Sequence, residues 1–79
     1  MKNILITGGS RGIGKEIVKI CHKNNFKVHF TYSNNLVSAK KLLDELSSEN
    51  ISFSQCNLNN YDDIKKLFSY LNGNDLFTP

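Results

Sequence analysis

The stretch T-G-G-S-R-G-I-G-K, from Thr7 to Lys15, constrains the fold more than any other part of this 79-residue sequence. It follows a short apolar run, residues 3–7, and precedes apolar residues that recur at helical spacing. Glycines between a buried strand and a helix allow the main chain to turn sharply and to approach a phosphate group closely. The sequence therefore predicts a strand, a glycine turn and a helix that together bind a phosphorylated ligand.

Two phosphate-binding patterns overlap in this stretch. Read from Gly9 it is G-x-x-x-x-G-K, the frame of an NTPase P-loop, and read from Thr7 it is T-G-x-x-x-G-x-G, a dinucleotide turn. A P-loop needs a Ser or Thr hydroxyl after its lysine to hold magnesium, but Glu16 stands there and would repel phosphate. The dinucleotide frame has a glycine wherever such a turn requires one, at Gly8, Gly12 and Gly14. We keep the P-loop NTPase as a remote alternative.

Hydrophobic patterning extends this unit into alternating strands and helices. Strands are predicted at residues 3–7, 27–32 and 51–56, and helices after the glycine turn, from Leu36 onward and after Asn59. Residues 75–77 look like the opening of a fourth strand. This order requires a parallel sheet, so we expect the α/β class: one partial Rossmann-type domain, three-layer α/β/α, over residues 1–79.

The pattern also predicts what each element buries. The first strand is expected to be buried on both faces, and the third to lie half covered at a sheet edge. Asn59 is expected to cap the third helix. The predicted apolar faces of the three helices are Ile13, Ile17, Ile20 and Cys21; Leu36, Ala39, Leu42, Leu43 and Leu46; and Ile64, Leu67, Phe68 and Leu71.

Composition narrows the function classes. With 39% apolar and 22% charged residues and no long apolar segment, the chain resembles a globular protein without a membrane partner, and we expect a cytoplasmic location. The net charge of +3 is scattered along the sequence, which argues against nucleic-acid binding. Cys21 and Cys56 are expected to be reduced packing residues, and neither has metal-ligand spacing with His22 or His29.

The octapeptide T-G-G-S-R-G-I-G, residues 7–14, resembles the cofactor signature T-G-x-x-x-G-x-G of the short-chain dehydrogenases/reductases, especially the 3-oxoacyl-[acyl-carrier-protein] reductase-like members. The resemblance covers the element order of all 79 residues but not the catalytic half of the family. It implies a nicotinamide dinucleotide and hydride transfer with a small carbonyl or acyl-carrier-bound substrate in the full-length protein. The chain would then be the N-terminal portion of such an enzyme, as a fragment or a natural truncation. The alternative is a non-catalytic truncated Rossmann module.

The phosphate state of the cofactor is suggested by the residues themselves. An NAD site usually places an acidic residue after its second strand, but residues 31–35 contain no carboxylate, whereas Arg11 in the glycine loop can grip a 2′-phosphate. This favours NADP(H) over NAD(H). In the similar NADP enzymes the loop Ser-Arg and the polar residues after the second strand hold that phosphate, and an Asp after the third strand contacts adenine; Asn57 replaces that Asp here. The expected cofactor-binding set is Gly8, Ser10, Arg11, Gly12, Ile13, Gly14, Tyr32, Ser33, Asn57 and Leu58.

No catalytic residue is predicted. The string Tyr61-x-x-x-Lys65 matches the family's Y-x-x-x-K pair, but it opens the third helix, whereas the family's pair follows the fifth strand. We therefore expect a helix-start packing tyrosine and a solvated lysine. The first strand should lack a neighbour on one side, and an open strand edge tends to pair, so self-association is expected.

Overall fold

The structure of the protein is a computed structural model that describes residues 2–47 and 49–73. Its three strands are parallel and lie in the order β1-β2-β3. The strands are β1 (Asn3–Ile6), β2 (Lys27–Tyr32) and β3 (Ile51–Gln55), and the helices are α1 (Gly12–Lys23), α2 (Leu36–Leu46) and α3 (Tyr61–Gly73). The predicted α/β class and the β-α-β-α-β-α order are confirmed. The fourth strand expected at residues 75–77 lies outside the described residues.

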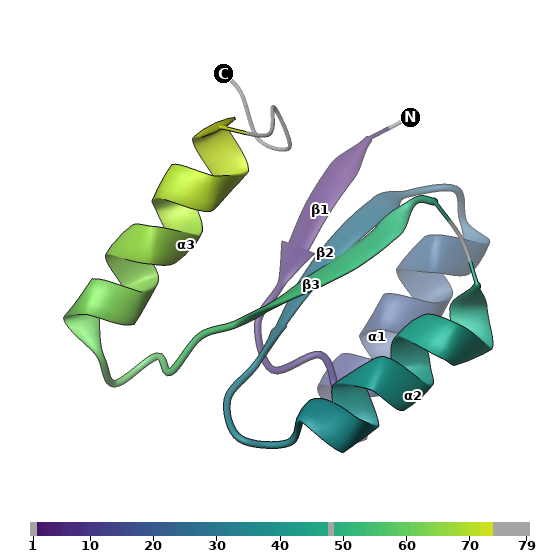
Figure 1. The fold of residues 1–79 in the computed structure, drawn as a ribbon. Helices are drawn as coiled ribbons and strands as arrows, with labels where there is room; N and C mark the ends of the chain where they lie inside the picture. The colour runs from purple at the N-terminus through teal and green to yellow at the C-terminus, as the bar shows by residue number, and fades with distance from the viewer. Residues whose placement is uncertain (1, 48, 74–79) are drawn as a thin grey trace.

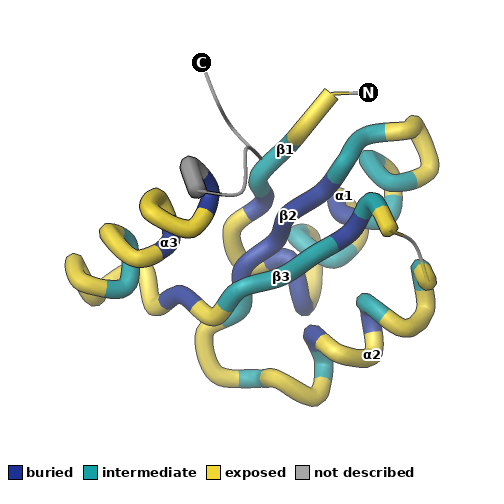
Figure 2. Tube along the Cα trace, turned by 45° about the horizontal axis from the view of Figure 1, so that its top comes forward, coloured by how far each residue is buried: buried dark blue, intermediate teal, exposed yellow. Residues whose placement is uncertain are grey.

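Helices cover both faces of the sheet, with α1 and α2 on one face and α3 on the other (Figure 1). The strand at the centre is β2, which is the most continuously buried element (Figure 2). Its side chains alternate between the faces, so that Val28 and Phe30 join the core beneath α1 and α2 while His29 lies beneath α3. That larger core consists of Ile6, Val18, Val28, Phe30, Ala39, Leu42 and Ile51.

The layer beneath α3 is smaller and partly polar. Its buried apolar cluster is formed by Cys56, Leu67 and Leu71. Beside this cluster, both ring nitrogens of His29 lie within hydrogen-bond distance of β3 hydroxyls, at 2.7 Å from Ser52 Oγ and 2.8 Å from Ser54 Oγ. The ring of Tyr70 lies over His29 with 5.3 Å between the centroids. A histidine with two hydroxyl partners therefore replaces apolar packing where α3 meets β2 and β3.

The buried face of α1 differs from the sequence prediction. Val18 is fully buried, whereas Ile13, Ile17 and Ile20 are 81%, 41% and 59% exposed. A second set of residues, Gly14, Val18 and Cys21, has the same helical spacing as the isoleucines, and this set faces the sheet because Gly14 allows close approach. Periodicity could not distinguish two overlapping stripes, and the bulkier one was wrongly chosen.

The other helices show smaller differences. In α2, Ala39 and Leu42 are buried and Leu43 and Leu46 are partly buried as predicted, but Leu36 at the first turn is exposed. In α3, Leu67 and Leu71 are buried, but the prediction was wrong for Phe68, which is 57% exposed. Phe68 lies one position past Leu67, about 100° around the helix, where no described element covers it.

The strand edges explain a further difference. β1 was expected to be buried on both faces, but only Ile6 is buried, while Ile4 and Leu5 are half-buried and Asn3 is exposed. Within the described residues β1 pairs with β2 alone, so it is itself an edge strand. β3 forms the opposite edge, and its half-covered state is confirmed.

The cap of α3 is Asn60 instead of the predicted Asn59. Asn60 Oδ1 accepts hydrogen bonds from the N–H groups of Asp62 and Asp63, at 2.9 and 3.2 Å. Asn59 belongs to a turn that precedes the helix. Its N–H donates to Asn57 Oδ1 at 2.9 Å, and the N–H of Asn60 donates to the Asn57 carbonyl. The helix therefore starts one residue later than its asparagine run indicated. None of the described helices has the length and apolar character needed to cross a membrane.

Candidate functional site

Two adjoining pockets lie where the carboxyl ends of the three strands meet, which is the edge where open α/β sheets bind ligands. The first, about 560 Å³, is lined by Gly8, Ser10, Arg11, Tyr32, Ser33, Asn34 and Asn35. The second, about 190 Å³, is lined by Gly8, Thr31, Tyr32, Ser33, Cys56, Asn57, Leu58 and Asn59. The fold thus brings seven of the ten predicted site residues to these two pockets, which share three lining residues, Gly8, Tyr32 and Ser33.

The remaining three predicted residues, Gly12, Ile13 and Gly14, form the first turn of α1 beside the first pocket. The first intrahelical hydrogen bond runs from Lys15 N to Arg11 O at 3.3 Å, so the three preceding N–H groups have no carbonyl within the helix. Arg11 is the N-cap residue, and within the described chain its side chain makes no capping bond. Free amides at a helix N-terminus attract anions, which is the property a pyrophosphate requires.

Two glycines of the turn adopt a backbone conformation that is unfavourable for any residue with a side chain. Gly8 and Gly12 have positive φ values of 66° and 58°, and a Cβ at either position would meet no atom within 4 Å. At these two positions the backbone angle, and not lack of space, requires glycine. Hydrogen bonds fix the turn to the end of β2, from Gly9 N to Thr31 O at 3.0 Å and from Gly8 N to Thr31 Oγ1 at 3.3 Å.

Two other glycines are required by close contacts. A Cβ on Gly14 would lie 2.1 Å from the carbonyl oxygen of Gly8, so α1 rests directly on the main chain of the turn. A Cβ on Gly9 would lie 2.6 Å from Cβ of Phe30 and 2.9 Å from a methyl carbon of Val18. The dinucleotide frame already requires a glycine at position 14, whereas the need for a glycine at position 9 was missed.

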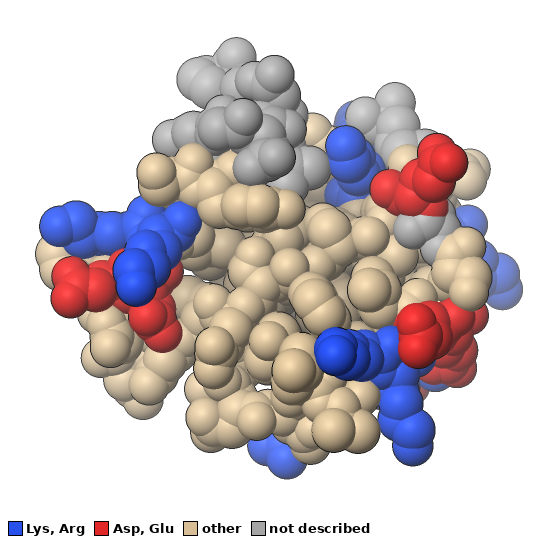
Figure 3. Space-filling view, viewed as in Figure 1, with Lys and Arg blue, Asp and Glu red and all other residues tan. Residues whose placement is uncertain are grey.

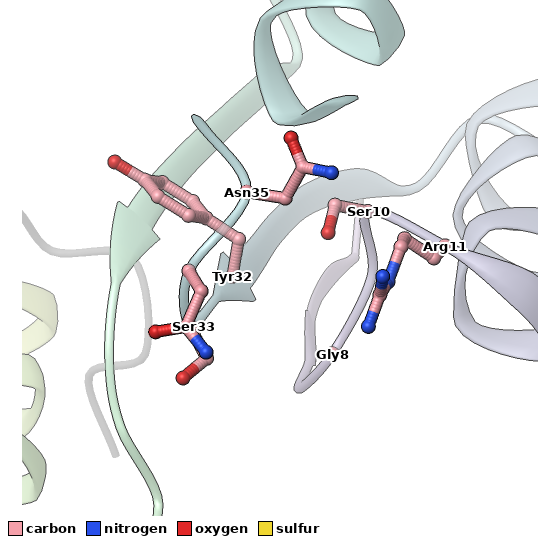
Figure 4. A pocket seen from close by; sticks show the side chains of 7 residues that line it. Gly8, Ser10, Arg11, Tyr32, Ser33 and Asn35 are labelled. Atoms are coloured by element: carbon pink, nitrogen blue, oxygen red, sulfur yellow. The ribbon is translucent and has the colours of Figure 1, made fainter. Parts of the chain in front are cut away.

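The walls of the first pocket combine hydroxyl, amide and guanidinium groups. Figure 4 shows Ser10 and Arg11 on one side, Tyr32 and Ser33 on the other, and Asn35 near Ser10. None of the described residues that line this pocket is acidic. Elsewhere on the surface, Lys and Arg side chains lie beside Asp and Glu around the rim of one face (Figure 3). The pocket therefore offers a cation and uncharged donors to an anionic group.

Five pocket residues were missed as site residues by the sequence analysis: Thr31, Asn34, Asn35, Cys56 and Asn59. Asn35 could have been found, because an asparagine before a helical pattern is a capping signal, and its Oδ1 accepts from Ser38 N at 3.0 Å. Thr31 carries no such signal, since its contact with the glycine turn joins residues 23 positions apart.

The second pocket is organised by Asn57. Its Oδ1 accepts from the N–H of Asn59, and its own N–H donates to Asp63 Oδ2 at 3.1 Å, so the loop is tied to the start of α3. Cys56 lies at the base of the loop, where burial and then the nearby Asp63 carboxylate raise the pKa of its thiol. This thiol is therefore kept neutral, as a packing group would be. Cys21 is half-buried, and both cysteines are free.

Tyr61 and Lys65 do not form a tyrosine activated by burial. Tyr61 is 72% exposed, and the Lys65 ammonium lies 5.0 Å from the centroid of its ring. This is a surface cation–π contact, not the expected packing of the tyrosine. Among residues 2–47 and 49–73, no group of three or more His, Cys, Asp or Glu side chains could hold a metal ion.

The start of α1 fits the dinucleotide frame. α1 begins at Gly12, so Gly12 and Gly14 lie in its first turn, where the glycines of a dinucleotide turn lead into the helix.

Comparisons with known proteins agree with this geometry. The family described as short chain dehydrogenase matches residues 2–74. The chain is 36% identical over 75 residues to 3-oxoacyl-[acyl-carrier-protein] reductase FabG of Rickettsia typhi, a match that covers 95% of this chain and 30% of that protein. It is 41% identical over 51 residues to the short chain dehydrogenase penD of Penicillium thymicola, which covers 63% of this chain and 18% of that protein.

A solved structure described as a 3-oxoacyl-reductase from Bacillus thuringiensis has the same fold, with a TM-score of 0.84 and 19% sequence identity. The superposition covers 90% of this chain and 30% of that one. The chain spans 30% or less of the length of each of these proteins. On the family match and the glycine turn, it belongs to the short-chain dehydrogenase/reductase family.

Proposed function

We propose that this chain binds NADP(H) as the cofactor-binding portion of a short-chain reductase. The observation that carries the proposal is the first pocket, in which Arg11 and Ser10 face Tyr32 and Ser33 without a carboxylate among the lining residues. A 2′-phosphate carries about two negative charges near neutral pH, and a guanidinium can hold it through paired, charge-assisted hydrogen bonds. An acidic residue, which would accept from a free ribose hydroxyl, would instead repel this phosphate.

The rest of the dinucleotide would extend along the site in a defined order. The free amides of Gly12, Ile13 and Gly14 suit the pyrophosphate. The second pocket, with Asn57 and Leu58, suits the adenine ring, because it combines an amide with an exposed apolar side chain. A nicotinamide cofactor supplies a hydride when bound; these residues would hold and orient its adenosine end.

The proposed reaction is hydride transfer between the cofactor and a carbonyl or alcohol, with a 3-oxoacyl group on a carrier as the favoured substrate class. The names of the relatives support this class. The chain's own residues support only the binding step, since Tyr61 and Lys65 lie on the surface at the start of α3. Catalysis would therefore require residues beyond these 79, in a longer reductase that operates in the cytoplasm. The free thiols of Cys21 and Cys56 suit a reducing compartment.

The decisive experiment is a comparison of NADPH and NADH binding by fluorescence titration. For Arg11→Ala we expect NADPH affinity to fall by roughly 10- to 150-fold, equivalent to about 1.5–3 kcal/mol, while NADH affinity changes little. The NADPH affinity of Arg11→Lys should lie between the affinities of the unsubstituted protein and of Arg11→Ala, because lysine keeps the charge but loses the paired geometry. Equal losses for both cofactors would reject the phosphate role of Arg11.

A gain-of-function variant gives an independent check. Ser33→Asp places a carboxylate in the wall of the first pocket, where it should repel the 2′-phosphate and accept from ribose hydroxyls. The preference should shift from NADPH toward NADH, whereas Ser33→Asn, of similar size, should leave it unchanged. An unaltered preference in Ser33→Asp would contradict this assignment.

The second candidate function is a non-catalytic nucleotide-binding module. The surface position of Tyr61 and Lys65 favours it, because it leaves groups suited to binding, and not to proton transfer, among the described residues. An NADPH oxidation assay with a 3-oxoacyl thioester tests the distinction: turnover by these 79 residues would exclude the module, while binding without turnover is what both the module and a cofactor-binding portion predict.

A further inference from the structure

The loop that joins β3 to α3 contributes one wall of the second pocket, and the side chain of Asn57 closes a turn within this loop (Figure 1). Asn57 Oδ1 accepts a hydrogen bond from the N–H of Asn59 at 2.9 Å. A main-chain N–H can only donate, so the side-chain atom that receives it must be the amide oxygen and not the amide nitrogen. The turn therefore decides which end of the Asn57 amide is engaged and which end is left.

The amide nitrogen is the end of Asn57 that remains for a ligand. Within the described part of the chain, Nδ2 of Asn57 has no hydrogen-bond acceptor, and it carries two N–H donors. The main-chain N–H of the next residue, Leu58, has no acceptor among the described residues either. Asn57 and Leu58 therefore supply neighbouring N–H donors to the pocket that both residues line.

Several acceptors of the same pocket are already used by the protein. Four main-chain carbonyl groups of the lining each accept a hydrogen bond from another residue, and they belong to Thr31, Tyr32, Ser33 and Asn57. One lone pair of each of these oxygens, like one lone pair of Asn57 Oδ1, is therefore engaged before a ligand binds. The lining thus offers a ligand unengaged donors beside partly engaged acceptors.

This balance of donors and acceptors bears on the group that a purine carries at C6. Adenine has an amino group there, which donates and needs an acceptor from the protein. A 6-oxopurine such as hypoxanthine has a carbonyl there instead, so its O6 and N7 are two neighbouring acceptors. A carboxylate at position 57 would accept from the adenine amino group with the oxygen that the turn leaves over, and it would repel O6. The Asn57 amide has its NH₂ group in place of that oxygen, and an NH₂ group matches O6.

We propose that the second pocket does not select adenine and that, because of Asn57, it binds a nucleotide with a 6-oxopurine base at least as tightly as the adenine nucleotide. The inference rests on the proposed function in one respect, namely that the base of a nucleotide occupies this pocket. It does not depend on the 2′-phosphate or on hydride transfer. Asn57 then sets the base specificity of the site through a difference between two affinities, as Arg11 sets its phosphate specificity.

Calorimetric titration of the 79-residue chain with NADPH and with its hypoxanthine counterpart tests the proposal. For the unsubstituted chain we expect the Kd of the hypoxanthine form to equal that of NADPH or to be lower by up to about tenfold. Asn57→Asp should reverse the order, with NADPH bound about tenfold more tightly than the hypoxanthine form. Aspartate can still accept from the N–H of Asn59, so this variant should retain the turn.

Asn60→Asp is the matched control for the added charge. Asn60 caps α3 and does not line the second pocket, and aspartate is an equally good capping residue. This variant should therefore leave the ratio of the two Kd values unchanged, although a nearby negative charge should weaken both nucleotides. A ratio that changes equally in Asn57→Asp and Asn60→Asp would overturn the assignment to Asn57.

ADP and inosine diphosphate, which have neither the nicotinamide nor the 2′-phosphate, separate this inference from the proposed cofactor. The same order of affinities and the same reversal in Asn57→Asp are expected with these two probes. If NADPH binds but its hypoxanthine form binds about tenfold more weakly to the unsubstituted chain, the inference fails and the proposed function stands. If the two diphosphates follow the expected order but NADPH is not preferred to NADH, the cofactor assignment fails and the inference stands. A chain that binds none of these nucleotides would overturn both.

Discussion

The glycines of the turn are required for two different physical reasons, and the sequence shows the need for three of the four. Gly8 and Gly12 adopt positive φ values, which the spacing of a dinucleotide turn already implies. Gly9 and Gly14 are required because a Cβ would collide with Phe30 and with the Gly8 carbonyl. The contact of Gly9 depends on a side chain more than 20 positions away, so no local pattern could have revealed it.

Gly14→Ala should destabilise the protein more than Gly12→Ala. The new Cβ at position 14 lies 2.1 Å from a backbone oxygen that has no rotamer by which to move away. We expect a loss of about 2–3 kcal/mol from overpacking. Gly12→Ala should cost about 1–2 kcal/mol for the left-handed conformation. Urea unfolding of the three proteins measures both changes, and an equally stable Gly14→Ala protein would show that α1 does not rest on the turn.

The two cysteines should differ in reactivity. Cys56 is buried, and burial and the Asp63 carboxylate raise the pKa of its thiol, so little of it is the reactive thiolate. Cys21 is only half-buried, so a reagent can reach it more easily. In the native protein at pH 8, a disulfide reagent should modify Cys21 first and reach Cys56 only after denaturant is added. Thiol release followed by absorbance gives the two phases. Cys21→Ala should remove the fast phase, and a fast phase that persists would assign it to Cys56 instead.

At the scale of the elements, the order of strands and helices could be predicted, and most of their limits to within one residue, because they depend on local patterns. The predicted limits of β2 agree with the structure, and α1 ends where Asn24 and Asn25 break the apolar spacing. The faces of α1 and α3 could not be predicted as well, because apolar residues lie on more than one side of each helix. Which side is buried depends on neighbours that a local pattern does not contain.

The start of α3 provides a paired test of its cap. Asn60→Ala removes the acceptor of two backbone N–H groups and should cost about 1 kcal/mol of unfolding free energy. Asn59→Ala should change stability by less than about 0.5 kcal/mol, since only its main chain takes part in the turn. The midpoint of chemical unfolding distinguishes the two variants. A larger effect at Asn59 would restore the assignment expected from the sequence.

At the scale of the whole molecule, the two faces of the sheet differ in chemistry. The α1 and α2 face is an apolar core, whereas the α3 face contains His29 with Ser52 and Ser54. Much of the site could be predicted, because the glycine turn and the polar residues after the strands carry recognisable patterns. The buried histidine could not, since alternating residues such as Val28 and His29 in β2 suggest a core face and a solvent face.

His29 should make stability depend on pH. Burial lowers the pKa of His29, so below about pH 6.5 the unfolded chain binds more protons than the folded protein. Stability should be complete above this pH and should fall as the pH decreases toward the folded pKa, by up to about 1.4 kcal/mol per pH unit for one proton. His29→Gln should flatten this dependence. Urea titrations at pH 7.5, 6.5 and 5.5 measure it, and an identical slope in the variant would assign the effect to other groups.

The hydrogen bonds from Gly8 and Gly9 to Thr31 have a consequence for how a ligand would be received. Ordering a flexible turn costs about 1–2 kcal/mol per residue, and here that entropy is lost when β1 and β2 pair, before any ligand arrives. The glycine turn would thus be preorganised for a nucleotide, which would not have to order it on binding. The glycine turn should have the same conformation with and without a bound nucleotide. The rate of nucleotide association should then be limited by diffusional encounter and not by a rearrangement of the turn.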